Sequence, residues 1–160
     1  DRVLVTADVE QDAKEKKVAS ADILPNRSQK YTTKPTFKQI ESMSEDEIKA
    51  VTNFTVISEY ATLEFEGPVD LRGVDIDKTI KMSHKMVEVY PDSEFGDSKP
   101  KIGDKLNKPA FITFNNFKLV KQGSSSKFIS KLKEMAASMN ATVIDVDKRN
   151  DSLKIYVEHF

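Results

Sequence analysis

The residues best suited to chemistry in this sequence are its two histidines, His84 and His159. His159 follows a stretch in which Leu153, Ile155 and Val157 occupy alternate positions. Because successive side chains of a strand point to opposite faces, this spacing predicts that the His159 imidazole lies on a buried, apolar face. A histidine there is either a hydrogen-bonded core residue, which is the commoner case, or a catalytic residue.

His84 lies among polar neighbours at the start of an apolar run. Lys81, Ser83 and Lys85 surround it, and this pattern favours an exposed, solvated imidazole. A Ser-His-Asp triad cannot be assigned by spacing, because serines and aspartates are plentiful and any choice among them is arbitrary.

Several classes of site are excluded by composition. The chain has no cysteine, which rules out thiolate zinc sites, iron–sulfur clusters and cysteine nucleophiles, and its five glycines match no nucleotide-binding motif. The acidic residues Asp145, Asp147 and Asp151 resemble a calcium loop in part. Arg149 interrupts this group and the turn glycine is missing, so a solvated hairpin is the better interpretation. We therefore expect no metal and no cofactor.

Length and charge narrow the function further. The 160 residues fit one domain. Lysine and arginine number 25 against 26 acidic residues, so charge gives nucleic-acid binding no support. No apolar run approaches the roughly 20 residues that span a bilayer, and the first residues do not resemble a leader peptide. We expect a soluble protein without membrane insertion.

Local patterns predict an arm or linker over residues 1–30 and a domain over residues 31–160. Pro35 is expected to open a short helix, and Ser44 with Glu47 forms a capping-box pattern that opens a second. Residues 75–79 are expected to form a turn.

Alternating apolar residues predict strands in the rest of the domain. The expected strands cover residues 54–56, 63–65, 69–71, 86–90, 110–114, 117–120, 142–146 and 153–160. A helix is expected from Ser126 to Asn140, and residues 91–109 read as a surface excursion. The predicted fold is α+β, mainly an antiparallel β-sandwich or curved sheet with flanking helices.

An ordered series of short blocks resembles the nucleoporin autopeptidase family, the self-cleaving C-terminal domains of GLFG-repeat nucleoporins, and its fungal members in particular. The similarity covers roughly residues 31–160. The blocks, in order, are YTTKP at 31–35, VTNF at 51–54, LEFEGPVDL at 63–71, VEVY at 87–90, LNKPA at 106–110 and VEHF at 157–160. Each block alone is weak, but their order and spacing together are specific.

The resemblance implies that this chain is the product of a single-turnover serine autopeptidase. The family cuts itself between the terminal His-Phe pair and a following serine, which implies cleavage after Phe160 by a serine absent from this sequence. His159 is carried over as the general base. Asn107 and Lys108 lie in a matching block, and we expect them either to polarise the Phe160 carbonyl or to be ordinary loop residues.

The resemblance also implies partners and a location. The domain would anchor upstream FG repeats, which bind transport receptors, to scaffold nucleoporins of the nuclear pore complex at the nuclear envelope. A groove beside the last strand would take back the protein's own C-terminal cleavage fragment. Where relatives carry a Gly-aromatic-Gly stretch, this chain has EYAT at 59–62, which gives RNA binding no support.

Two other functions remain open at this stage. The chain could be a peptide- or scaffold-binding module that does not cleave itself. A hydrolase acting on free substrates ranks last, because the sequence identifies no nucleophile of its own in a pocket.

Overall fold

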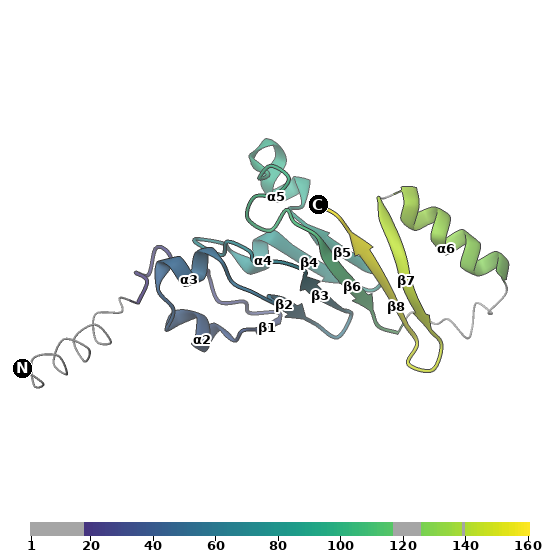
Figure 1. The fold of residues 1–160 in the computed structure, drawn as a ribbon, viewed down its shortest axis with the longest axis horizontal. Helices are drawn as coiled ribbons and strands as arrows, with labels where there is room; N and C mark the ends of the chain where they lie inside the picture. Colours follow the sequence, from purple (N-terminus) through teal and green to yellow (C-terminus); the bar gives the residue numbers. More distant parts are fainter. Residues whose placement is uncertain (1–17, 117–125, 139) are drawn as a thin grey trace, which may run out of the picture.

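The computed structural model describes residues 18–116, 126–138 and 140–160. Six antiparallel strands form the main sheet in the order β1-β2-β3-β6-β8-β7 (Figure 1). Their bounds are β1 Thr32–Lys34, β2 Thr55–Ile57, β3 Ala61–Phe65, β6 Ala110–Phe114, β7 Ala141–Asp147 and β8 Ser152–Val157. A separate hairpin pairs β4, Ile80–Ser83, with β5, Met86–Val89. The predicted α+β class with a mainly antiparallel sheet is confirmed.

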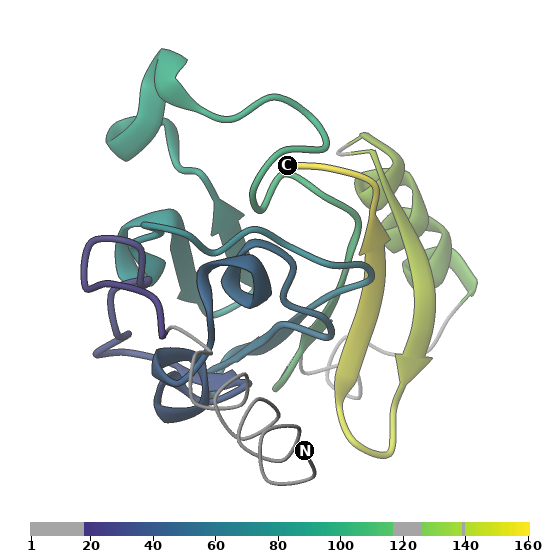
Figure 2. The ribbon, with the colours of Figure 1, turned by 60° about the vertical axis from the view of Figure 1, so that its left-hand side comes forward.

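Short helices flank the sheet. They are α2 Phe37–Glu41, α3 Glu45–Lys49, α4 Ile76–Thr79, α5 Asp92–Phe95, the 3-10 turn Gly96–Ser98 and α6 Ser126–Ser138. Two views place α6 along β7 at the end of the sheet, and its residue Ala136 is buried (Figures 1 and 2). No helix in the described part of the chain has the length and apolar character needed to cross a bilayer.

One face of the sheet forms the core. The cross-strand row Leu63, Ile112 and Ile155 is buried, whereas the next row along β3, β6 and β8, which points to the other face, is exposed or half-buried. This is the alternation expected of an antiparallel sheet with one apolar face. Ile80 of β4 and Ile48 of α3 belong to the same core.

The helix starts follow side-chain chemistry. Ser44 accepts a hydrogen bond from the Glu47 N–H, and the Glu47 side chain reaches back to the Ser44 N–H, so the predicted capping box is confirmed. The expected start at Pro35 is wrong by two residues. Thr36 caps α2 through an equivalent box with Gln39, which places Pro35 outside the helix because the cap must be extended.

Other expectations need correction. The turn expected at 75–79 is a helical turn, α4, because Asp75 accepts a hydrogen bond from the Lys78 N–H and caps it. Residues 69–71 form no strand of the sheet, and the pairing recorded there is a single bridge between Val51 and Val69. Strands β1 and β4 were not predicted. The strand expected at 117–120 lies outside the described residues.

The 91–109 segment is exposed over most of its length, as expected of a surface excursion, with residues 92–94, 96–99 and 101–104 on the surface. Its end differs, because Leu106 and Asn107 are 0% and 2% exposed. The excursion returns into the core before β6 begins. A groove beside the last strand is also restricted, because β8 is flanked by β6 on one side and β7 on the other. Residues 158–160 lie beyond this pairing.

The segment before residue 31 is attached to the domain where it is described. The Ala19 N–H donates to the Met43 carbonyl at 2.9 Å, and the Asn26 N–H donates to the Val74 carbonyl at 2.8 Å. Residues 1–17, the rest of the expected arm, lie outside the described residues.

The capping box predicts a measurable stability effect. Ser44→Ala removes the side-chain acceptor for the Glu47 N–H and should lower the free energy of unfolding by about 1 kcal/mol in urea denaturation. Ser130→Ala, at an exposed position inside α6, is the control and should change it by less than about 0.5 kcal/mol. Equal effects of the two substitutions would contradict the proposed contribution of the cap.

Candidate functional site

The end of the chain is held by one polar and one aromatic contact. After β8 the backbone runs on to Phe160, whose N–H donates to the Asn107 Oδ1 at 2.7 Å. The Phe160 ring lies 6.1 Å from the Phe65 ring, tilted by 60°, and Phe65 in turn stacks on Phe54 at 6.0 Å. These contacts fix the position of the residue that the sequence marks as the cleavage site.

Strand register brings Asn107 and Phe160 together. β6 and β8 are antiparallel, and Ala110 pairs with Val157. Asn107 precedes Ala110 by as many residues as Phe160 follows Val157, so both lie just beyond the same end of this strand pair. The two residues are far apart in sequence, and the strand pairing together with the path of the loop before β6 makes them neighbours.

The Asn107 side chain is oriented by its surroundings. It is 2% exposed, and its Nδ2 donates to the Pro100 carbonyl at 2.9 Å. A carbonyl only accepts and a backbone N–H only donates, so Asn107 must turn its nitrogen to Pro100 and its oxygen to Phe160. The main chain of Asn107 is held as well, because its carbonyl accepts from the Gly103 N–H at 2.7 Å.

Tyr90 holds Leu106, the residue before Asn107 in the loop that leads into β6. Its hydroxyl accepts a hydrogen bond from the Leu106 N–H at 2.9 Å, and the side chain is buried. Burial raises the Tyr90 pKa to about 12. The residue adopts a φ of +59°, a region that costs a bulky side chain energy, so the surrounding packing must hold it there.

Charged side chains brace the same loop from a second side. The Lys105 Nζ donates to the Arg72 carbonyl at 2.7 Å and lies 3.6 Å from Asp70, which pairs with the Arg72 guanidinium at 2.8 Å. Burial acts to raise the Asp70 pKa, but the hydrogen bonds from Arg72 and the charge of Lys105 outweigh it. The pKa of this carboxyl therefore lies below its usual value.

Lys108 anchors the end of the loop. Its ammonium donates to the Pro68 carbonyl at 2.8 Å. The Asn107 Nδ2 thus donates to the Pro100 carbonyl, and the Lys108 ammonium donates to the Pro68 carbonyl. Asn107 contacts Phe160 through its Oδ1, which is an acceptor. The role of the two residues in polarising the Phe160 carbonyl stays a prediction.

His159 lies next to the held residue. It is half-buried, and its Nδ1 is a buried polar atom that has no hydrogen-bond partner among the described residues. Buried polar atoms are nearly always paired, so an unpaired one needs an explanation such as a chemical role. The unpaired Nδ1 argues against the interpretation of His159 as a fully hydrogen-bonded core residue. His84, by contrast, is exposed as predicted.

Sequence reasoning missed Tyr90 and Lys105. Tyr90 lies in a sequence block that carries the family resemblance, and Lys105 lies directly before another. That resemblance is the signal that could have identified them. Their contacts with Leu106 and Arg72 depend on the path of the intervening chain. No periodicity in the sequence predicts these contacts.

The Nup98-96 autopeptidase S59 family model matches residues 28–160. The chain belongs to this family. Its relatives include NUP98A of Arabidopsis thaliana, 26% identical over 84% of this chain and 14% of the relative, and Nup98-Nup96 of Dictyostelium discoideum, 26% identical over 81% and 7%. NUP96 of Arabidopsis thaliana is 33% identical over 87% of this chain and 14% of its own length.

The family relationship fixes the location but leaves most of each relative unmatched. The chain spans 7 to 14% of the length of these three relatives, all of them nuclear pore complex proteins. This is therefore a nucleoporin domain of the nuclear pore complex.

Solved structures of the family share the fold. A Chaetomium thermophilum Nup145N APD matches with a TM-score of 0.68 at 24% identity, over 83% of this chain and 96% of that one. The yeast Nup82-Nup159-Nup116 complex contains a chain that matches with a TM-score of 0.69 at 21% identity, over 82% and 97%.

The Tyr90 environment predicts a pH effect on stability. Between its ordinary pKa near 10 and about 12, the unfolded chain releases the tyrosine proton while the folded domain retains it. Stability should therefore fall as pH rises through this window. Urea denaturation at pH 9, 10 and 11 checks this against Tyr90→Phe, which lacks the titrating hydroxyl.

Lysines also titrate in this range, so the difference between the two proteins is the quantity to follow. The native protein should lose more stability than the Tyr90→Phe variant from pH 10 upward. Parallel losses would show that Tyr90 is not held neutral by its burial.

Proposed function

We propose that this domain cuts its own polypeptide after Phe160, using His159 and a serine that follows Phe160 in the precursor. The observation that carries the proposal is the pairing of a buried Asn107 with the Phe160 N–H, next to a His159 whose Nδ1 has no partner among the described residues. Membership of an autopeptidase family supports it.

The chemistry is an acyl shift followed by hydrolysis. The serine hydroxyl oxygen attacks the Phe160 carbonyl carbon while His159 takes its proton. The C–N bond then breaks, the serine nitrogen leaves as an amine with that proton, and an ester links Phe160 to the serine oxygen. Water hydrolyses the ester, which frees the Phe160 carboxylate and the downstream chain. The nucleophile departs with that chain, so each molecule reacts once.

Holding the scissile residue is what the domain contributes. An amide is more stable than the corresponding ester, so the fold must favour the transition state at this bond. The Asn107 oxygen holds the N–H of Phe160 and the Phe65 ring contacts its side chain, which limits the movement of the residue that is attacked. Asn107 and Lys108 remain candidates for polarising that carbonyl.

The lasting role that we propose is anchoring. In the full-length protein the domain would bind scaffold nucleoporins and so fix upstream FG repeats, which bind transport receptors, at the pore. The solved yeast Nup82-Nup159-Nup116 complex supports this, because a chain with this fold is assembled there with two other nucleoporins. The C-terminal cleavage fragment is a further proposed partner.

That complex also favours a second candidate, a scaffold-binding domain that does not cleave itself. The two candidates share the fold and the binding surface. They differ in whether the bond after Phe160 breaks.

Cleavage is tested by extending the chain with a serine-led segment after Phe160 and measuring product masses over time. We expect cleavage after Phe160 and its loss in His159→Ala, because the proton acceptor is removed, and in the variant whose following serine is alanine. His84→Ala, at an exposed histidine, is the matched control and should cleave at the native rate. A chain that stays intact would contradict self-cleavage and leave the non-cleaving scaffold-binding domain as the remaining candidate.

The Asn107 contact gives an independent test in the same extended chain. Asn107→Ala removes the acceptor of the Phe160 N–H and should slow cleavage by at least about tenfold, which corresponds to about 1.4 kcal/mol. Asn107→Asp keeps an acceptor oxygen and should retain more activity than alanine. Circular dichroism must show both variants folded, and a folded alanine variant that cleaves at the native rate would contradict the positioning role.

A further inference from the structure

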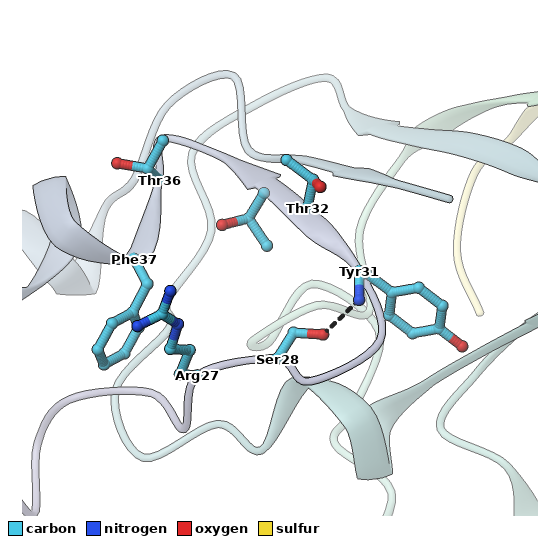
Figure 3. A pocket seen from close by; sticks show the side chains of 7 residues that line it. Arg27, Ser28, Tyr31, Thr32, Thr36 and Phe37 are labelled. Carbon is cyan, nitrogen blue, oxygen red and sulfur yellow. Dashed lines mark hydrogen bonds between the residues drawn. The ribbon is translucent and has the colours of Figure 1, made fainter. Parts of the chain in front are cut away.

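A cavity of about 250 Å³ lies at the opposite edge of the sheet from β8 and β7, beside β1. It is open to solvent and lies between the segment that carries Arg27, the strand β1 and the start of α2 (Figure 3). Its lining consists of Arg27, Ser28, Tyr31, Thr32, Thr33, Thr36 and Phe37. Four of the seven are hydroxyl residues of the serine and threonine type, and none is acidic.

Arg27 offers hydrogen-bond donors to this cavity. Its side chain is exposed, and its guanidinium lies 5.9 Å from the centre of the Phe37 ring, near the outer limit of a cation–π contact (Figure 3). Among the described residues, no carboxylate or carbonyl accepts a hydrogen bond from it. Arginine presents its N–H groups as a fork that matches two oxygens of one oxyanion.

Two hydroxyl groups add to the fork. Thr36 uses its oxygen to accept from the Gln39 N–H at 3.2 Å, which leaves its own O–H available as a donor. The Thr32 hydroxyl has no hydrogen-bond partner in the described part of the chain. The Thr33 hydroxyl, by comparison, already donates to the Pro35 carbonyl at 2.9 Å.

The surrounding charge favours an anion. Residues 27–38 contain four basic side chains and no acidic one, although the whole chain carries a net charge of −1. Asp77 lies outside the lining, and its oxygens accept from the Ser28 hydroxyl and the Gln29 N–H. A second cavity, beside Tyr60, has the acidic residue Glu59 in its lining together with Lys30 and Lys81, so its charges are mixed.

The size of the cavity limits its occupant. Pockets for drug-sized ligands measure roughly 300–1,000 Å³, so about 250 Å³ suits one side chain better than a nucleotide. A phosphorylated side chain brings up to two negative charges and three acceptor oxygens, enough for the Arg27 fork and two hydroxyls. We propose that this cavity binds the phosphate group of a phosphoserine or phosphothreonine in a partner peptide.

This site is independent of the cleavage proposed above. β1 is separated from β8, the strand that leads to Phe160, by β2, β3 and β6 in the sheet. Loss of phosphopeptide binding would leave self-cleavage unaffected, and the converse also holds.

The experiment is an amide NMR titration of the whole chain with a blocked pentapeptide of alanine and glycine around a central phosphothreonine. We expect saturable shifts at Arg27, Thr32 and Thr36 with a dissociation constant of about 1 mM or tighter. Arg27→Gln should weaken binding at least about tenfold, and Thr32→Val should weaken it less. Arg149→Gln, in the exposed turn between β7 and β8, makes the same charge change and should leave binding unchanged.

Several results would overturn the proposal. These are equal shifts with the unphosphorylated peptide, equal losses in Arg27→Gln and Arg149→Gln, and inorganic phosphate binding as tightly as the peptide. Tighter binding of single-stranded DNA at the same amides would assign the site to nucleic acid instead.

Discussion

The hydrogen bond between the Phe160 N–H and the buried Asn107 side chain is the interaction on which the rest of the site depends. An amide that is 2% exposed must have partners for both its oxygen and its nitrogen, because an unpaired buried polar group costs about 1–3 kcal/mol. Pro100 and Phe160 provide those partners. The loop therefore has one favourable arrangement, and that arrangement fixes the terminal residue.

The remainder of the fold keeps this loop in place. Tyr90 holds the Leu106 N–H from the segment that follows β5, and Lys105 and Lys108 reach back to the carbonyls of Arg72 and Pro68. These contacts come from separate parts of the chain, so the loop cannot shift without breaking several of them. A position defined in this way suits the single self-cleavage that we propose at this bond.

The two ends of the sheet carry different chemistry. Next to the end of β8, the buried Asn107 side chain and the hydrogen bonds around its loop hold Phe160 in one position, which suits the cleavage that we propose. On the β1 side, four basic residues and a hydroxyl-lined cavity lie in a chain that is almost neutral as a whole. Under the two proposals above, one small domain combines self-cleavage after Phe160 with phosphopeptide recognition beside β1.

The sequence by itself determined the α+β class, the Ser44 capping box and the alternation that buries Leu153, Ile155 and Val157, because these depend on neighbours along the chain. Ordered blocks also pointed to the family and to His159 and Asn107. Only the tertiary structure decided that the 91–109 segment returns into the core and that Asn107 lies opposite Phe160. Both depend on the register between β6 and β8 and on packing against distant segments, and such long-range pairings leave no local pattern in the sequence.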